Sequence, residues 1–272
     1  MNLAYPTLDA FPGLTTLARQ AYLSYKGQFL WLNWPAYVSN VLLRPGLIVA
    51  MYSLTGRFAR GPEAAEAYVI GLTAYAVPGI IMGGVLQSFY YERSWGTIAF
   101  LFASRGGRLD SFLTRGALHV PNAVLAVIAG IVFAALFLHA SYDGANWPAV
   151  TASYLVMALA ATACALCIAN LSIVLRDWQT LYGLVLTCFL VASGVVIPRD
   201  EVPYGLGALG TVLPVTHALE ALRRAFDGAS LGAVSGDLAL EALIGLAYVV
   251  FGYFLFRAVE AYARRSGAYD VA

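Results

Sequence analysis

The side chains of this sequence that could carry out chemistry are few and widely spaced. His119, His139 and His217 lie near the ends of apolar segments, where an imidazole usually forms interfacial hydrogen bonds. Cys164 and Cys167 form a CxxC pair, yet no second ligand pair accompanies it, so we interpret both thiols as packed hydrophobic groups. No Ser–His pair, paired aspartates or HExxH spacing occurs within the apolar segments. We therefore expect no catalytic residue, bound cofactor or metal in this chain.

Lysine is almost absent from the sequence, and Lys26 is its single occurrence. The residues around it do not form a GxxxxGK[ST] loop, in which a lysine and backbone amides hold nucleotide phosphates. If ATP drives this protein, another chain must bind the nucleotide. The net charge is +1, and the charges lie between apolar blocks instead of forming a patch, so we expect no nucleic-acid partner.

The elements that position these residues are expected to be helices within a bilayer. Of the 272 residues, 60% are apolar and 11% are charged, which is outside the usual range of soluble domains. A spanning helix needs about 20 mainly apolar residues, and only helices fit such unbroken runs. Six windows meet this condition, at residues 36–56, 67–90, 117–138, 148–174, 180–197 and 238–258. We predict an all-α polytopic membrane protein with a single transmembrane domain over residues 1–272.

Lysine and arginine in the connections predict the orientation of the chain, because positive charge accumulates on the cytoplasmic side. With the N-terminus inside, ten of these residues are cytoplasmic and five are outside, and Arg44 lies within a span. The even number of spans places the C-terminus on the same side. We therefore expect a multi-pass protein of a bacterial plasma membrane with both termini in the cytoplasm.

Three segments outside the spans have patterns of their own. Residues 14–30 repeat apolar side chains at helical spacing, which predicts a helix lying in the membrane interface. Residues 91–115 form a cytoplasmic segment with four arginines. Residues 198–236 face outside, and prolines divide them into short pieces. One of these pieces is an amphipathic helix with a Glu220–Arg224 pair at i, i+4, which we expect to lie at or dip into the outer leaflet.

Several short motifs follow one another along the chain. The sequence ERSWGT occupies residues 92–97, SGVVIP occupies residues 193–198 and EALR occupies residues 220–223. In their order and spacing these motifs resemble the type-2 ABC export permease family, whose members often begin a coupling helix with E-R-x-x-G-T after the second span. One departure is Leu213, which stands before Pro214 where the family often has asparagine.

The resemblance implies a fold and a set of partners. It implies six transmembrane helices, an N-terminal interfacial helix, a cytoplasmic coupling helix and an external re-entrant hairpin between spans five and six. It also implies a transport subunit without an ATPase site of its own. Two ATP-binding-cassette subunits would bind ATP and Mg, and a second permease copy, identical or different, would complete a dimer surrounded by membrane lipid.

The coupling segment is where the resemblance assigns contacts with the ATPase. The residues that it assigns are Glu92, Arg93, Gly96, Thr97, Arg105 and Arg108. A short charged helix docked in a cleft of the ATPase could pass a rigid-body movement to the spans. The alternative is that these arginines only enforce orientation at the membrane surface.

A candidate substrate path starts from one stripe of the second span. Its side chains recur every seven residues, and the fifth span has a parallel pair; together they are Tyr68, Tyr75, Met82, Phe89, Tyr182 and Phe189. In the family that this chain resembles, spans two and five form the walls of the path. Aromatic rings and a thioether would suit an amphipathic passenger. Ordinary helix packing or a lipid-facing stripe would produce the same pattern.

Arg44 belongs to the same candidate path but is open to two interpretations. An arginine inside an apolar span costs several kcal/mol on typical scales. Pro45 and Gly46 follow it, and they could loosen the helix enough for the side chain to reach the inner interface. Arg44 therefore either extends to the interface or faces a substrate or subunit.

The function expected from these observations is outward export of an amphipathic drug-like, lipid-like or peptide substrate, powered by a separate ATPase. Export of a polysaccharide or lipid-linked glycan is an alternative, because such permeases share this architecture. An ion-coupled secondary transporter is a second alternative. It is disfavoured because spans two to five carry no ionisable residue in their middles, where such transporters usually keep one.

Overall fold

The computed structural model describes residues 34–96, 116–172, 177–196, 202 and 204–266. Throughout these parts the regular elements are helices, as the composition predicts. The expected interfacial helix at residues 14–30 lies outside the described residues. So do Thr97, Arg105 and Arg108 of the expected coupling segment, together with residues 197–201.

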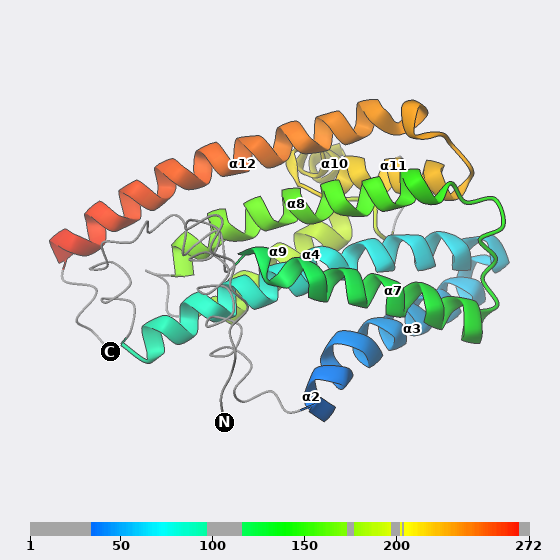
Figure 1. Cartoon of the computed structure of the whole chain (residues 1–272), viewed down its shortest axis with the longest axis horizontal. Coiled ribbons are helices and arrows are strands. Elements are labelled where there is room, and N and C mark those ends of the chain that lie inside the picture. The colour runs from blue at the N-terminus through cyan, green and yellow to red at the C-terminus, as the bar shows by residue number, and fades with distance from the viewer. Residues whose placement is uncertain (1–33, 97–115, 173–176, 197–201, 203, 267–272) are drawn as a thin grey trace, which may run out of the picture.

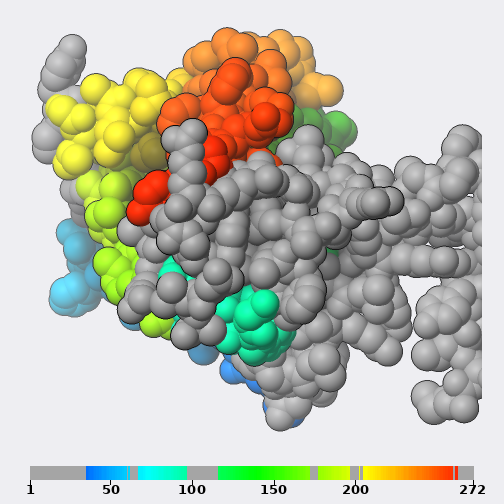
Figure 2. All heavy atoms as spheres, turned by 90° about the vertical axis from the view of Figure 1, so that its left-hand side faces the viewer, coloured from blue at the N-terminus to red at the C-terminus, as the bar shows by residue number. Residues whose placement is uncertain are grey.

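The helices lie side by side as one bundle (Figure 1). In chain order they are α2 (Trp34–Val38), η1 (Ser39–Leu43), α3 (Arg44–Arg60), α4 (Pro62–Ser94), α7 (His119–Leu138), α8 (Trp147–Ser172), α9 (Trp178–Ala192), α10 (Tyr204–Val212), α11 (Thr216–Phe226) and α12 (Leu231–Ser266). The described ends of α4 and α12 lie at the same end of the bundle, which Figure 2 shows from outside. The loop between α7 and α8 lies at the opposite end.

Among the described residues, five helical segments are long and apolar enough to cross a membrane. They are Pro35–Ala59, Ala67–Ser94, His119–Leu138, Trp147–Leu171 and Leu231–Val259. The protein is therefore a multi-pass membrane protein. α10 and α11 would make a sixth span if they are counted together, but an angle of 86° separates their axes.

α9 is shorter than a spanning helix. It has 15 residues where the sequence predicts a span at 180–197. At a rise of about 1.5 Å per residue it is roughly 22 Å long, less than the hydrocarbon thickness of about 30 Å. α9 alone is therefore too short to cross the bilayer.

Local sequence accounts for the helix ends that shape the bundle. Gly61 has φ +95°, a conformation that glycine adopts freely, and Pro62 occupies the first turn of α4. At the start of α9, the Asp177 carboxylate accepts hydrogen bonds from the Thr180 hydroxyl and from the backbone N–H of Gln179 and Thr180. The Thr180 hydroxyl contributes most to lowering the pKa of Asp177, and the backbone bonds add to it.

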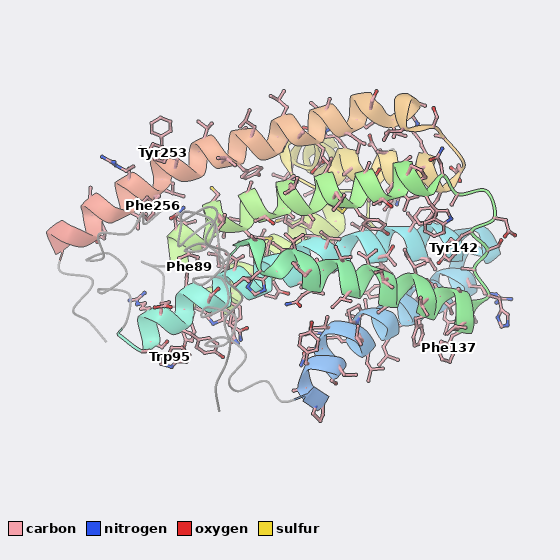
Figure 3. All side chains as sticks on the ribbon, viewed as in Figure 1. Phe89, Trp95, Phe137, Tyr142, Tyr253 and Phe256 are labelled. Carbon is pink, nitrogen blue, oxygen red and sulfur yellow. The ribbon has the colours of Figure 1, made fainter. Side chains whose placement is uncertain are left out.

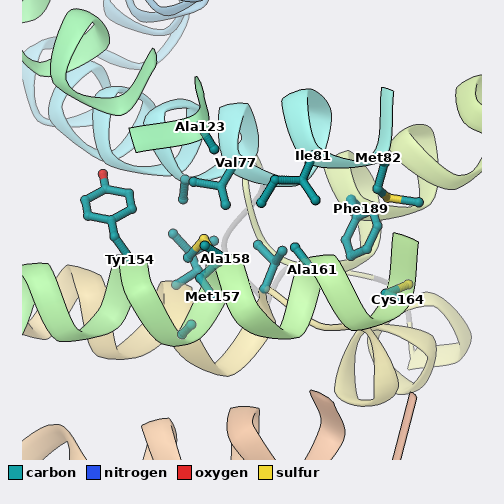
Figure 4. Packing of buried hydrophobic residues seen from close by; sticks show 14 of the residues in the cluster. Val77, Ile81, Met82, Ala123, Tyr154, Met157, Ala158, Ala161, Cys164 and Phe189 are labelled. Carbon is teal, nitrogen blue, oxygen red and sulfur yellow. The ribbon is translucent and has the colours of Figure 1, made fainter. Parts of the chain in front are cut away.

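α8 lies at the centre of the packing, in contact with α4, α11 and α12. Figure 4 shows Val77 and Ile81 of α4 facing Met157, Ala158 and Ala161 of α8. Toward α12, small side chains let the two backbones approach closely. A Cβ placed on Gly245 would lie 3.1 Å from the Cα of Ala160, and one on Gly252 would lie 3.2 Å from the Cα of Cys167.

The outer faces of the bundle are apolar. α12 exposes large side chains along its length, including Leu243, Phe251 and Phe254, and Figure 3 shows Tyr253 directed away from the bundle. A surface of this kind would be insoluble in water but matches a lipid environment.

Candidate functional site

A cavity of about 610 Å³ lies between η1 and α3 on one side and α4, α7 and α9 on the others. Its volume is typical of sites for small molecules. α4 makes room for it by presenting small residues to the cavity, among them Ala76, Gly79 and Gly83. The polar side chains that line it are Asn40, Arg44, Tyr52, Tyr75, Gln87, His119, Asn122 and Tyr182. The cavity is therefore amphipathic, with polar groups set among aliphatic ones.

Arg44 is placed in this cavity by a local irregularity in the first span. The five residues Ser39–Leu43 before it form a π-helical turn, which inserts an extra residue into the helix and changes the direction of the side chains that follow. Arg44 is exposed and lines the cavity together with Tyr75 and Tyr182. Among the described residues it has no carboxylate partner.

Hydrogen bonds fix several of the other polar groups that line the cavity. The Tyr182 hydroxyl donates to the backbone oxygen of Gly79, at 3.0 Å, and so ties α9 to α4. The Tyr37 hydroxyl donates to Oδ1 of Asn122, at 2.7 Å. His119 is only 3% exposed, and its Nε2 atom has no hydrogen-bond partner within the described structure. Such an atom beside a cavity is a free position for a ligand or for water.

A second polar feature lies where α10 meets α11, and its residues do not line the cavity. The chain turns sharply at Val215, whose φ is +108°, and the first backbone N–H groups of α11 point at Glu241 of α12. The Glu241 carboxylate accepts hydrogen bonds from Val215 at 2.5 Å, His217 at 3.2 Å and Ala218 at 3.1 Å. Glu241 is 0% exposed, so a buried carboxylate of α12 caps the N-terminal end of α11.

Glu241 is a residue that the sequence analysis missed. Glu241 lies in the last predicted span, at 238–258, and not in spans two to five, whose middles carry no ionisable residue. The signal was present, because a glutamate within an apolar span is costly unless it has partners. The sequence alone could not name those partners, since they lie 23 to 26 residues earlier.

Arginines anchor the other side of α11. Arg223 donates through Nη2 to the backbone oxygen of Gly194 at 2.6 Å, linking α11 to the end of α9. Arg224 pairs with Asp237 of α12 at 2.7 Å, so the expected Glu220–Arg224 pair is wrong. The arginine reaches a neighbouring helix instead. Seven of the eleven residues of α11 are buried. The helix packs against α8 and α12.

A sequence model of the ABC-2 type transporter family matches residues 16–226 of this chain. The chain belongs to the ABC-2 type transporter family. A search of curated proteins found no match. The chain is thus the membrane permease of an ABC transporter, a transport subunit whose family implies association with an ATP-binding-cassette ATPase.

In this ABC-2 permease the residues predicted to line a substrate path occupy three different settings. Arg44, Tyr75 and Tyr182 line the cavity together. The side chains of Met82, Phe89 and Phe189 are fully buried in the core, and Figure 4 shows Met82 beside Phe189. Tyr68 packs against Gly56 of α3. A seven-residue repeat drifts around a straight helix by about 20° per repeat, so one stripe can serve both a cavity and a core.

The described part of the predicted ATPase-coupling segment lies at the end of α4. Glu92 and Arg93 are in its last turn, and Gly96 follows with φ +68°, a conformation that favours glycine. The Trp95 ring is exposed (Figure 3). It stacks on the Tyr91 ring, and the two ring centroids are 5.2 Å apart. The glycine of the ERSWGT motif therefore ends the helix and turns the chain. Contact of this segment with an ATPase stays a prediction.

Proposed function

We propose that this ABC-2 permease exports an amphipathic drug-like, lipid-like or peptide substrate from the cytoplasmic side of a bacterial plasma membrane. It would work as a dimer, with an identical or related second permease and two ATPase subunits that bind ATP and Mg. The observation that carries the proposal is the cavity between α3, α4 and α9, which combines tyrosine rings, aliphatic side chains and a few polar groups.

The lining supports a small amphipathic passenger. Tyrosine rings offer large contact areas and a polar tip, and aliphatic residues such as Ile48, Leu72 and Leu186 accept the apolar part of a ligand. A volume of about 610 Å³ holds a drug-sized molecule. This size favours a small amphiphile over a sugar polymer as the molecule bound within one subunit.

The α4 helix supports a mechanical link from the ATPase side to the cavity. It runs for 33 residues, contributes Tyr75 and Gln87 to the cavity and ends beside Glu92 and Arg93. A packed helix moves as a unit, so a displacement at its end would change the cavity wall. Ion coupling has less support, because both carboxylate oxygens of Glu241 are occupied by backbone N–H groups.

The first test is biochemical assembly. The permease alone should not hydrolyse ATP, whereas the permease co-purified with its ATPase should hydrolyse ATP faster when a substrate is present. Tyr75→Ala should reduce substrate stimulation by about tenfold, since a ring contact is worth on the order of 1–2 kcal/mol. Basal hydrolysis should remain.

Tyr253→Ala is the matched control, because Tyr253 lies on the outer face of α12, away from the cavity. It should leave stimulation unchanged. Thermal unfolding of each variant distinguishes lost binding from lost folding. Failure of any ATPase to co-purify, or equal effects of the two tyrosine variants, would contradict the proposed function.

A further inference from the structure

The cavity has a charge that nothing in its described lining balances. Its lining includes one arginine, Arg44, and no aspartate or glutamate among the described residues. Arg44 is exposed in the structure but belongs to the apolar segment Pro35–Ala59, where an ion pair is the usual compensation for a guanidinium. Here the described structure supplies none.

Two groups in the cavity lining can donate hydrogen bonds to a ligand, whereas the amide nitrogens of Asn40 and Gln87 already donate to the Ala36 backbone oxygen and the Tyr91 hydroxyl. Oδ1 of Asn122 is occupied by the Tyr37 hydroxyl, which leaves the amide nitrogen as a donor. The unpartnered, buried Nε2 of His119 donates when it carries the proton. A guanidinium with such donors around it matches the oxygens of a phosphate or carboxylate, which arginine binds with two parallel hydrogen bonds.

Arg44 also lies at a junction between polar and apolar surfaces. A shallower hollow of about 290 Å³ adjoins the cavity and shares Arg44, Ile48 and Met51 with it. The rest of this hollow is formed mainly by Leu43 and Leu47, which are 51% and 58% exposed. A molecule with its head group at Arg44 could therefore lay an apolar tail along α3 toward the lipid.

We infer that the substrate of this permease is an anionic amphiphile, with a phosphate or carboxylate head group bound by Arg44 and a tail on the apolar face of α3. This inference rests on the proposed export function and names the substrate class of the same cavity. A cationic amphiphile fits less well, because Arg44 repels it and the described lining offers no carboxylate to bind it.

The test compares amphiphiles that share a sixteen-carbon tail, about the length of a membrane lipid chain, and differ in the charge of the head group. Native mass spectrometry of the purified permease measures binding of hexadecyl phosphate, palmitate, hexadecylphosphocholine and hexadecyltrimethylammonium. The two anions should bind about tenfold more tightly than the other two, as expected for one favourable charge pair with Arg44.

Two substitutions at Arg44 and one control separate charge from structure. Arg44→Gln should abolish the preference for anions, whereas Arg44→Lys should keep most of it. Arg57→Gln removes an exposed arginine of the same helix that does not line the cavity, and it should leave the preference intact. Equal binding of all four amphiphiles by the unaltered permease, or an anion preference that survives Arg44→Gln, would overturn the inference.

Transport distinguishes a substrate from a resident lipid, because both could present the same head group. In proteoliposomes containing the permease and its ATPase, hexadecyl phosphate should move to the opposite leaflet only with ATP. Tight binding without such movement would identify a bound lipid and overturn the inference. If no ATPase associates but Arg44-dependent anion binding persists, the exporter function fails while the binding site itself is supported.

Discussion

At the scale of single residues, Glu241 illustrates how a membrane protein holds an ionisable group inside a span. Both carboxylate oxygens are occupied by backbone N–H groups at the start of α11. These N–H groups have no partner within their own helix, and bilayer lipid cannot supply one. The carboxylate and the helix end therefore satisfy each other, and each would be unfavourable alone.

Replacing Glu241 should destabilise the permease more than replacing Asp237, which lies on the same helix. Glu241→Ala leaves three buried N–H groups without acceptors, and we expect a loss of roughly 3 kcal/mol or more. Glu241→Gln keeps the volume but replaces one acceptor with a donor, so its loss should be smaller and still measurable. Thermal unfolding in detergent tests both.

Asp237→Ala serves as the control for this series. Its carboxylate pairs with Arg224 in a more exposed setting, and such pairs contribute about 0–1 kcal/mol. Equal unfolding midpoints for Glu241→Ala and Asp237→Ala would show that the cap contributes nothing to stability.

At the scale of elements, the packing of α8 on α12 depends on glycine. Gly245 lies so close to Ala160 that an added Cβ would be 3.1 Å from both its Cα and its Cβ. Gly245→Val should force the helices apart and cost roughly 1–3 kcal/mol. The same substitution at Gly236, where no atom lies within 4 Å of an added Cβ, should cost much less.

A compensating pair makes the test of this seam more specific. Gly245→Ala combined with Ala160→Gly moves one methyl group across the interface and should recover part of the stability lost in Gly245→Ala alone. No recovery, or an equal loss from Gly236→Val and Gly245→Val, would indicate that close approach is not what limits this position.

At the scale of the whole molecule, the long helices run between the two ends of the bundle. The described ends of α4 and α12 share one end, and the connection through Gly144 lies at the other (Figure 1). With the arginine asymmetry of the sequence, this arrangement predicts that the α4 end is cytoplasmic and the Gly144 end faces outside.

Cysteine labelling tests this orientation in a background without Cys164, Cys167 and Cys188. A membrane-impermeant reagent should label a cysteine placed at position 144 in intact cells. A cysteine at position 106, in the predicted cytoplasmic segment, should react only after the membrane is opened. The reverse pattern would invert the proposed direction of transport.

The sequence alone showed that the protein lies in a membrane, that it is helical and to which family it belongs. Long apolar runs require a bilayer and allow only helices within it, and this argument needs no knowledge of which helix lies beside which. The ERSWGT motif at residues 92–97 is likewise a local pattern, and it lies within the matched residues 16–226. Local composition and order were sufficient for each of these conclusions.

Only the tertiary structure decided which of these residues meet. It brought Arg44 to Tyr75 and Tyr182, placed Met82 and Phe189 in the core, and gave Glu241 its partners in α11. Helical periodicity shows which side chains share a face, but every span here is apolar around most of its circumference, so the pattern does not select a neighbour. Packing between helices distant in sequence makes that selection, because it depends on small residues such as Gly245 and Gly252 and on irregularities such as the π-helical turn before Arg44.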